Sequence, residues 1–259
     1  MAKLLQIHST DLGTKYPLIG TGDEGYIYKY NEEIALKIYT KIRVANSQSK
    51  YRRKLLKLKD MISNLRDPNC AFPLGFVTFN GIDIVGIYLP LVKKHYQLTD
   101  FDDLPILRDK KRIIEYLIKA DKCIQRLHQQ EIILGDIKED NILINENEEP
   151  IFIDTDNYQY KHHIFDLIPD RAGCLYYTYG TSSMCLQDND ILVYAIMSLY
   201  LLTHDERFNF CSPKESLSAA LHTLHLEKEI LKELEYIFSP RLDKPYIGPI
   251  LEKVNINRM

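Results

Sequence analysis

The amino-acid sequence has no apolar run long enough to cross a lipid bilayer. Its longest run, Ile191–Leu202, is shorter than the roughly 20 residues that a membrane-spanning helix needs. The N-terminal segment Met1–Lys15 also lacks the apolar core of about 7–15 residues that secretory signal peptides contain. We therefore expect Met1–Lys15 to stay on the mature chain and Ile191–Leu202 to form a buried helix.

Cysteine is scarce and follows no spacing that indicates a disulfide framework or a zinc site. The five cysteines are an odd number, lie far apart and form no C-x-x-C pair. This usage favours a reducing cytoplasm. The cysteines are Cys70, Cys123, Cys174, Cys185 and Cys211.

The chain also has little net charge. A formal charge of −3 at pH 7 gives no general attraction to nucleic acid or to anionic membranes, although a local patch can still bind either. We therefore expect neither as a partner. With 259 residues, of which 45% are hydrophobic, the chain is long enough for one large domain or a two-lobed unit with a buried core.

Short β-prone runs dominate the first part of the chain, and helical patterns dominate the rest. The predicted strands are Tyr16–Ile19, Tyr26–Tyr30, Ile34–Tyr39, Phe76–Phe79 and Ile82–Leu89. One amphipathic helix interrupts them at Gln48–Leu65, and a long one follows at Arg108–Gln129. This order predicts an α+β protein with two unequal lobes that are joined near Leu89–Lys94.

Three glycines, Gly20, Gly22 and Gly25, separate two β-prone runs. The spacing G-x-G-x-x-G occurs in dinucleotide-binding folds and in ordinary turns. A dinucleotide-binding loop opens a helix, whereas the residues after Gly25 are β-prone. Strand, glycine loop and strand instead favour a hairpin whose backbone N–H groups approach phosphate oxygens. The loop acids Asp23 and Glu24 must then face solvent or a basic partner, because carboxylates beside phosphate are unfavourable.

A single lysine, Lys37, lies in the next apolar strand, within the sequence ALKIY. A lone lysine in such a strand usually lies at the solvent edge of a sheet. On the strand that follows the glycine hairpin, however, its ammonium group can reach phosphates held by the loop. The position of Lys37 therefore favours a phosphate contact.

The segment GDIKEDNILI places Asp136, Lys138 and Asn141 in the pattern D-x-K-x-x-N, and Asp154 follows thirteen residues after Asn141. An acidic, turn-rich surface hairpin is the simpler interpretation, but such a hairpin does not require these residues in this order after a glycine loop and a strand lysine. Amide and carboxylate oxygens suit Mg²⁺. Phosphoryl transfer depends on charge neutralisation and in-line positioning, which these groups can provide.

On these motifs the sequence resembles the protein-kinase-like superfamily from about Ile19 through Leu202. The resemblance implies a bilobal protein-kinase-like fold, with a small β-rich N-lobe that has one main helix and a mostly helical C-lobe. It implies one kinase-like domain over residues 1–259, with the N-lobe at 1–91 and the C-lobe at 92–259. It also implies ATP and magnesium as cofactors.

The same resemblance implies a role for each matched residue. Asp136 orients the substrate hydroxyl or accepts its proton, and Lys138 neutralises the transferring phosphoryl group. Asn141 and Asp154 are the magnesium ligands. The hinge backbone around Leu89–Leu91 pairs with adenine. The implied nucleotide-binding residues are Gly20, Gly22, Gly25, Ile27, Lys37, Leu89 and Leu91.

The small-lobe helix departs from the family pattern. The family places a glutamate there as the partner of the strand lysine, but no Asp or Glu occurs from Ile38 through Lys59. Asp60 is one substitute partner for Lys37, and direct pairing with Asp154 and the nucleotide is another. The helix instead carries a basic run, which is most often a solvated face and less often a contact to phosphate or to an acidic partner. The run comprises Lys50, Arg52, Arg53, Lys54, Lys57 and Lys59.

Three further departures concern the catalytic and activation segments. Leu134-Gly135 replaces the H-R of H-R-D, so the arginine that pairs with a phosphorylated activation loop is missing. Asp154-Thr155-Asp156 replaces D-F-G, adds a second carboxylate and resembles a bacterial branch of eukaryotic-like Ser/Thr kinases. No A-P-E follows the D-T-D segment, and clustered hydroxyls within Gly173–Met184 predict autophosphorylation. The hydroxyls belong to Thr178, Thr181, Ser182 and Ser183.

Three functions fit this pattern. A Ser/Thr protein kinase acting on a protein substrate is the leading interpretation, because Lys138 suits a protein hydroxyl acceptor in the family pattern. A small-molecule kinase of the aminoglycoside or choline type is the alternative, because Gly135-Asp136 with Asn141 resembles the H-G-D-x-x-x-x-N motif of those enzymes. A nucleotide-binding pseudokinase is the third, because the helix glutamate is absent. We expect a cytoplasmic protein or an effector that acts in a host cytoplasm.

Overall fold

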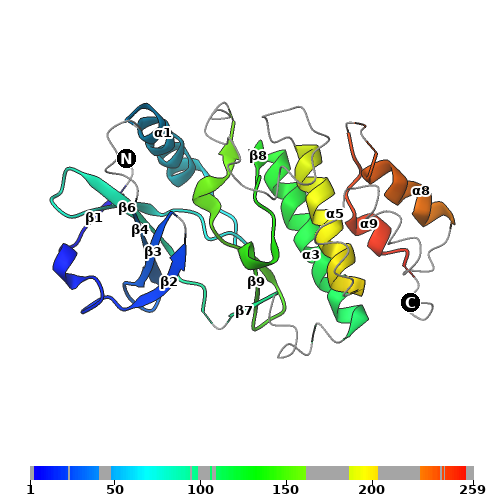
Figure 1. Cartoon of the computed structure of the whole chain (residues 1–259), viewed down its shortest axis with the longest axis horizontal. Helices are drawn as coiled ribbons and strands as arrows, with labels where there is room; N and C mark the ends of the chain where they lie inside the picture. Colours follow the sequence, from blue (N-terminus) through cyan, green and yellow to red (C-terminus); the bar gives the residue numbers. More distant parts are fainter. Residues whose placement is uncertain are drawn as a thin grey trace. The chain divides into compact units, whose positions relative to one another are not determined.

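The chain divides into two compact units, which we describe one at a time. Unit 1 comprises Met1–Lys94 and Ile151–Asp156, and unit 2 comprises His95–Pro150 and Asn157–Met259. The computed structural model describes residues 3–22, 24–40, 48–93, 95–98, 106, 109–161, 187–203, 228–239, 241 and 243–254 (Figure 1). The two lobes at 1–91 and 92–259 within one kinase-like domain stay a prediction.

Unit 1 contains a six-stranded sheet in the order β1-β5-β6-β4-β3-β2. Its strands are β1 (Lys3–Gln6), β2 (Leu18–Gly22), β3 (Gly25–Lys29), β4 (Ile34–Tyr39), β5 (Gly75–Thr78) and β6 (Ile84–Pro90). β1 runs parallel to β5, and the other neighbours are antiparallel. The predicted strands are confirmed with small shifts at their ends. β1 was not predicted, because it is short, largely exposed and has no alternating apolar pattern.

The two faces of β4 carry different side chains. Leu36 and Ile38 point into an apolar core that also contains Ile7, Tyr16 and Val77. Because successive side chains of a strand point to opposite faces, Lys37 points away from this core, yet it is only 5% exposed. The solvent-edge position that is usual for a strand lysine therefore does not apply to Lys37.

Helix α1 (Gln48–Asn64) forms at the predicted place in unit 1. Leu58, Met61 and Ile62 are buried, as is Leu65 just after the helix, and their three-to-four spacing places them on one helix face. Arg52, Arg53 and Lys59 are exposed, whereas Lys57 is buried. The basic run is therefore not a uniformly solvated face.

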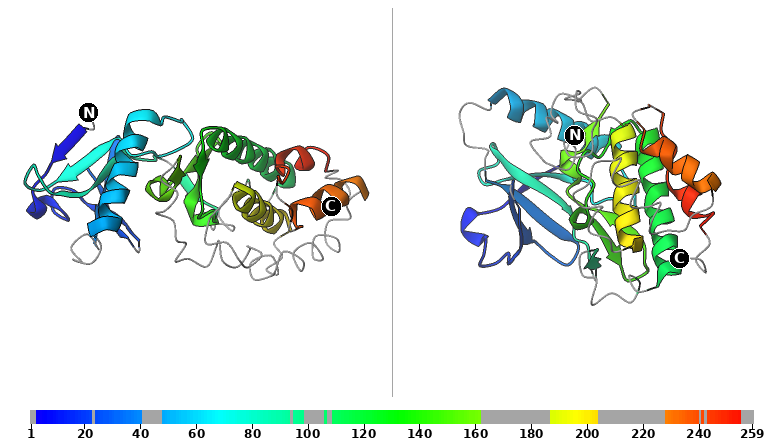
Figure 2. Two further views of the ribbon diagram at one scale, coloured as in Figure 1. Left: turned by 90° about the horizontal axis from the view of Figure 1, so that it is seen from above. Right: turned by 45° about the vertical axis from the view of Figure 1, so that its right-hand side comes forward.

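Unit 2 is built mainly from helices. Within its described residues they are α3 (Lys110–Gln129), α5 (Gln187–Thr203), α8 (Lys228–Ile237) and α9 (Gly248–Leu251). Helix α3 packs against α5 and α9, and α8 packs against α5 and α9; α3 and α5 lie side by side in both views of Figure 2. Asp109 caps α3 by accepting hydrogen bonds from the backbone N–H groups of Lys111 and Arg112.

Helix α5 is apolar on all sides, as the sequence predicts for a buried helix. Every residue from Asp190 through Leu202 is buried except Tyr200, and the hydroxyl of Tyr194 donates to the carbonyl of Leu117 on α3 at 2.7 Å. No helix within the described ranges has both the length and the apolar character that crossing a bilayer requires.

Short strands and turns carry the chain between the helices of unit 2. β7 (His95–Gln97) pairs with β9 (Ile142–Asn145), and β8 (Ile132–Ile133) pairs with β11 (Gln159–Tyr160), both antiparallel. β10 (Pro150–Phe152) begins in unit 2 and continues into unit 1. The turn η3 (Glu139–Asn141) leads directly into β9, which places the D-x-K-x-x-N segment between β8 and β9.

Several predicted features lie outside the described residues. They are Asp23, the hydroxyls at Thr178, Thr181, Ser182 and Ser183, and three cysteines, Cys174, Cys185 and Cys211. The other two cysteines, Cys70 and Cys123, are buried.

The glycine hairpin yields a first prediction about stability. A Cβ atom at Gly25 would lie 2.2 Å from the carbonyl oxygen of Ile38 on β4, whereas one at Gly20 would make an ordinary 3.6 Å contact with Ile27. We therefore expect Gly25→Ala to lower the free energy of unfolding by about 1–3 kcal/mol, because the backbone of β4 is too tightly packed to move away from the added methyl group.

The matched control is Gly20→Ala, which we expect to change the free energy of unfolding by no more than about 0.5 kcal/mol. Urea denaturation of the wild type and both variants measures the difference. Equal losses in the two variants would contradict the packing reason for Gly25.

Candidate active site

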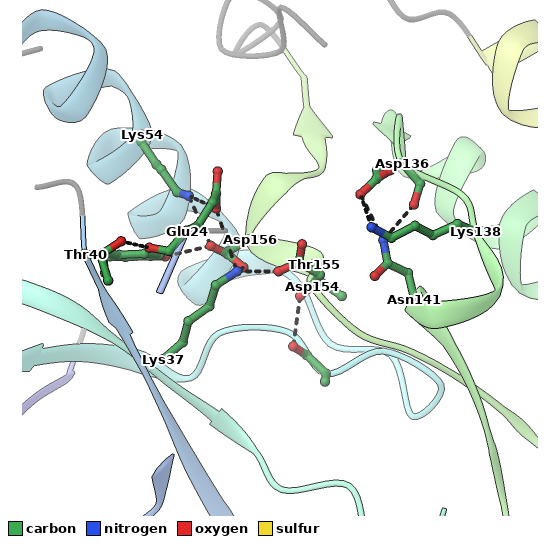
Figure 3. A network of polar contacts seen from close by, with 12 residues as sticks. Glu24, Lys37, Thr40, Lys54, Asp136, Lys138, Asn141, Asp154, Thr155 and Asp156 are labelled. Carbon is green, nitrogen blue, oxygen red and sulfur yellow. Dashed lines mark hydrogen bonds and ion pairs between the residues drawn. The ribbon is translucent and has the colours of Figure 1, made fainter. Parts of the chain in front are cut away.

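The ammonium group of Lys37 is the centre of a cluster of charged side chains in unit 1 (Figure 3). It donates to Asp154 and, at 2.7 Å, to Asp156, and it lies 3.8 Å from a carboxylate oxygen of Glu24. Among the described residues these three carboxylates make its ion pairs, and Asp60 does not. Of the two partners considered for Lys37 on the basis of sequence, Asp154 is therefore confirmed and Asp60 is wrong.

Asp156 is the most buried carboxylate of this cluster, with 2% of its side chain exposed. It accepts hydrogen bonds from Lys37 and from the hydroxyl of Tyr39, each at 2.7 Å, and lies 3.2 Å from Nζ of Lys54. Burial alone would raise the pKa of Asp156, but the charges of Lys37 and Lys54 outweigh it and hold the pKa well below its usual range. Asp156 is therefore ionised at neutral pH.

Burial and neighbouring charges also have opposing effects on the pKa of Lys37. Burial alone would lower the pKa of its ammonium group, but the charges of Asp156, Asp154 and Glu24 outweigh burial and raise the pKa. Lys37 is therefore a permanent cation inside unit 1. Breaking such a buried pair by removing one partner typically costs about 3–5 kcal/mol.

Local backbone structure explains why both aspartates reach one lysine. Asp154 adopts a positive φ of 57°, and the turn η4 (Thr155–Asn157) follows at once. The hydroxyl of Thr155 donates to the carbonyl of Ala71 at 2.8 Å, which fastens the turn to unit 1. A left-handed conformation costs an L-residue about 1–2 kcal/mol, although aspartate tolerates it better than most. Such strain is typical of functional positions.

Glu24 connects the glycine hairpin to helix α1. Its carbonyl accepts from the backbone N–H of Thr40 at 3.0 Å, and its carboxylate pairs with Lys54 at 3.0 Å. Burial alone would raise the pKa of Glu24, but the charges of Lys54 and Lys37 outweigh it, so the pKa lies below its usual value. The expectation that Glu24 faces a basic partner is confirmed.

Three of the predicted nucleotide-binding residues, Gly20, Ile27 and Lys37, lie in one row across the sheet. Gly20 is opposite Ile27, Ile27 is opposite Lys37, and Lys37 is opposite Ile87. Directly opposed residues point to the same face of a sheet, so this row faces away from the apolar core around Leu36. A Cβ atom at Gly22 would come no closer than 3.9 Å to the neighbouring protein atoms. Protein packing therefore requires glycine at Gly25 but not at Gly20 or Gly22.

Two residues predicted to contact adenine at the hinge, Leu89 and Leu91, already make backbone contacts within unit 1. Leu89 is paired with Ala35 across β6 and β4. The backbone N–H of Leu91 donates to the carbonyl of Glu33 at 2.8 Å. An adenine contact at Leu91 therefore cannot use this N–H group unless the bond to Glu33 breaks.

A second cluster lies in unit 2 and holds the three residues of the D-x-K-x-x-N motif (Figure 3). The side-chain amide of Asn141 donates to the backbone carbonyl of Asp136 at 2.9 Å and to its carboxylate at 3.0 Å. Nζ of Lys138 lies 3.5 Å from the same carboxylate. The structure thus brings Asp136, Lys138 and Asn141 together, as their spacing indicates.

Asp190, at the start of α5, holds the backbone just before Asp136. Its carboxylate accepts from the N–H groups of Leu134 at 2.7 Å and Gly135 at 2.9 Å, and it lies 3.0 Å from Nε2 of His128. The other ring nitrogen of His128 bonds to the hydroxyl of Tyr246 at 2.8 Å. No local sequence pattern indicates this role of Asp190.

Replacing Asp190 tests how much this contact stabilises unit 2. Asp190→Ala leaves buried N–H groups without an acceptor, so we expect it to lower the free energy of unfolding by about 3–5 kcal/mol. Asp190→Asn keeps one acceptor oxygen and should cost less. Urea denaturation measures both, with Glu115→Ala on an exposed position of α3 as the control. A loss for Asp190→Ala no larger than for Glu115→Ala would show that the contact does not hold the loop.

Comparison with known proteins gives only distant similarity. No protein-family model matches the chain. The chain is 24% identical to Phytosulfokine receptor 1 of Arabidopsis thaliana over 216 residues, which are 80% of this chain and 21% of the receptor. This similarity suggests a distant protein-kinase-like relationship. The mixed α+β fold, with a β-rich sheet and several helices, is compatible with that relationship.

Proposed function

We propose that this protein transfers the γ-phosphate of ATP to a Ser or Thr hydroxyl of a protein substrate, with magnesium as the required ion. The observation that carries the proposal is the buried pairing of Lys37 with Asp154 and Asp156. The ammonium group of Lys37 is a permanent cation on the strand after a glycine hairpin, and the carboxylate of Asp154 beside it can bind a metal. The distant kinase-like similarity supports the same class of reaction.

In this proposal unit 1 binds the nucleotide. Backbone N–H groups at Gly20 and Gly22 approach the phosphates, because neither glycine has a side chain that would keep a ligand away from the backbone. Ile27 contacts the base from the same face of the sheet as Lys37. Lys37 neutralises phosphate charge. The carbonyl of Leu91 and the side chain of Leu89 are the candidate adenine contacts, because the backbone of Leu89 is paired with Ala35.

Asp154 and Asn141 are the proposed magnesium ligands. Both offer oxygen atoms, which a hard cation prefers, and magnesium usually takes only one or two protein carboxylates together with substrate phosphates. Within the described part of the chain no group of three His, Cys, Asp or Glu side chains is placed to hold a metal, so a site made by protein carboxylates alone is not what we propose. When bound, magnesium would neutralise charge on the phosphates.

In this proposal the second cluster acts on the hydroxyl acceptor. The hydroxyl oxygen forms a bond to the γ-phosphorus, the bond from that phosphorus to the bridging oxygen of ADP breaks, and the hydroxyl proton passes to Asp136. Asn141 orients the Asp136 carboxylate through its amide, and Lys138 neutralises the transferring group. The D-T-D segment and Lys138 together favour a Ser/Thr kinase of the bacterial branch over a small-molecule kinase.

Phosphate transfer from labelled ATP tests this function. We expect Asp136→Asn to lower the transfer rate by about 10²–10⁴-fold, because a positioned general base contributes that much. The matched control is Asp140→Asn, an exposed acid of the same turn, which should keep wild-type activity. Acceptors should include a generic protein substrate, an aminoglycoside and choline. Equal transfer by the wild type and Asp136→Asn would refute an enzymatic role, and transfer only to a small molecule would favour the alternative acceptor class.

Thermal denaturation tests the magnesium ligand. A ligand that binds the folded state raises the melting temperature, so magnesium should increase the shift caused by ATP in the wild type. We expect Asp154→Asn to abolish this additional shift, because it removes a charged oxygen ligand. Asp83→Asn, at an exposed turn of unit 1, is the control. A magnesium-dependent shift that survives in Asp154→Asn would show that Asp154 does not bind the ion.

A further inference from the structure

The three carboxylates around Lys37 are not equivalent. Asp154 is the proposed metal ligand, so its charge is shared with magnesium when the nucleotide is bound. Glu24 belongs to the glycine hairpin and lies 3.8 Å from the ammonium group. Asp156 is 2.7 Å from Lys37 and almost fully buried. Asp156 is therefore the carboxylate placed to remain with Lys37 throughout the reaction.

Helix α1 contributes a cation to this cluster. Lys54 lies 3.2 Å from Asp156 and 3.0 Å from Glu24, with 22% of its side chain exposed. Its ammonium group also lies 4.5 Å from the ring centroid of Tyr39, whose hydroxyl donates to Asp156. Lys54 and Lys37 thus approach the two oxygens of one carboxylate from the helix and from the strand. Figure 3 shows this arrangement.

We propose that Asp156 is the positioning residue for Lys37 and that Lys54 of helix α1 holds Asp156 in place. This inference rests on the proposed function. In the family pattern a strand lysine pairs with a glutamate of the helix. Here helix α1 supplies a cation instead, and the carboxylate between the two lysines comes from the segment after β10. The basic run of α1 therefore carries a contact within unit 1, at Lys54, and not only a solvated surface.

The charges of the cluster explain why both lysines are needed. Lys37 and Lys54 contribute two positive charges, and Glu24, Asp154 and Asp156 contribute three negative ones. Without Lys54 the balance would be one positive against three negative charges, beside the place where phosphates are proposed to bind. Removing Lys54 therefore leaves excess negative charge that repels the nucleotide and draws Lys37 toward the carboxylates.

Binding of Mg-ATP to the full chain, followed with a fluorescent ATP analogue, tests the inference. Asp156→Asn preserves shape but removes the charge. We expect it to weaken affinity about tenfold or more, because loss of the buried charge partner that positions Lys37 outweighs the removal of one negative charge near the phosphates. The effect should vanish in a Lys37→Met background, because Asp156 acts through Lys37. A purely structural role for Asp156 would instead weaken affinity equally in both backgrounds, and that result would overturn the inference.

The part played by the helix is tested separately. Lys54→Met keeps the length and apolar stem of the side chain and should weaken Mg-ATP affinity several-fold. Lys59→Met, an exposed lysine of the same helix, is the control and should bind as the wild type does. Equal affinities of Lys54→Met and the wild type would exclude Lys54 from the arrangement.

A measurement without nucleotide separates this inference from the proposed function. If the wild type does not bind Mg-ATP, the proposed function fails. The pairing of Lys37 with Asp156 is then tested by urea unfolding of Lys37→Met, Asp156→Asn and the double variant. Strongly non-additive changes in the free energy of unfolding would support the pairing of Lys37 with Asp156. Additive changes would reject it.

Discussion

The burial of the Lys37 ammonium group against Asp156 is the constraint on which the rest of unit 1 depends. A charge at this depth is tolerated only with a partner at hydrogen-bonding distance, and that partner comes from a segment more than a hundred residues further along the chain. The left-handed backbone of Asp154, the turn η4 and the bond from Thr155 to Ala71 all serve to deliver that segment. Folding of the sheet and placement of the D-T-D motif are therefore coupled.

Local patterns predicted much of the fold and the candidate residues. The hairpin around Gly20–Gly25 and the strand of Lys37 could be predicted because turn glycines and β-prone runs determine structure within a few residues of each other. The proximity of Asp136, Lys138 and Asn141 could be predicted because a single turn brings them together. The short edge strand β1 was missed because its four residues carry no alternating apolar pattern.

Long-range contacts were harder to predict. Nothing in the neighbourhood of Lys54 indicates that it pairs with Asp156, because the two residues meet only through the packing of α1 beside the sheet. The same holds for Tyr39 and for Asp190, whose three hydrogen-bonding partners lie more than fifty residues away in sequence. The charge of α1 was the one available signal, since a basic run of this kind can contact an acidic partner, although it is more often a solvated face.

If Asp156, and not an acidic residue of helix α1, positions Lys37 for phosphate binding, a crystal structure of the chain with magnesium and a non-hydrolysable ATP analogue will show it. We expect that Lys37 contacts a phosphate oxygen while it keeps its bond to Asp156, that Asp154 binds magnesium, and that Glu24 stays with Lys54. A structure in which Lys37 leaves Asp156 for Asp60, or in which the phosphates bind away from Lys37, would show that Asp156 does not position Lys37.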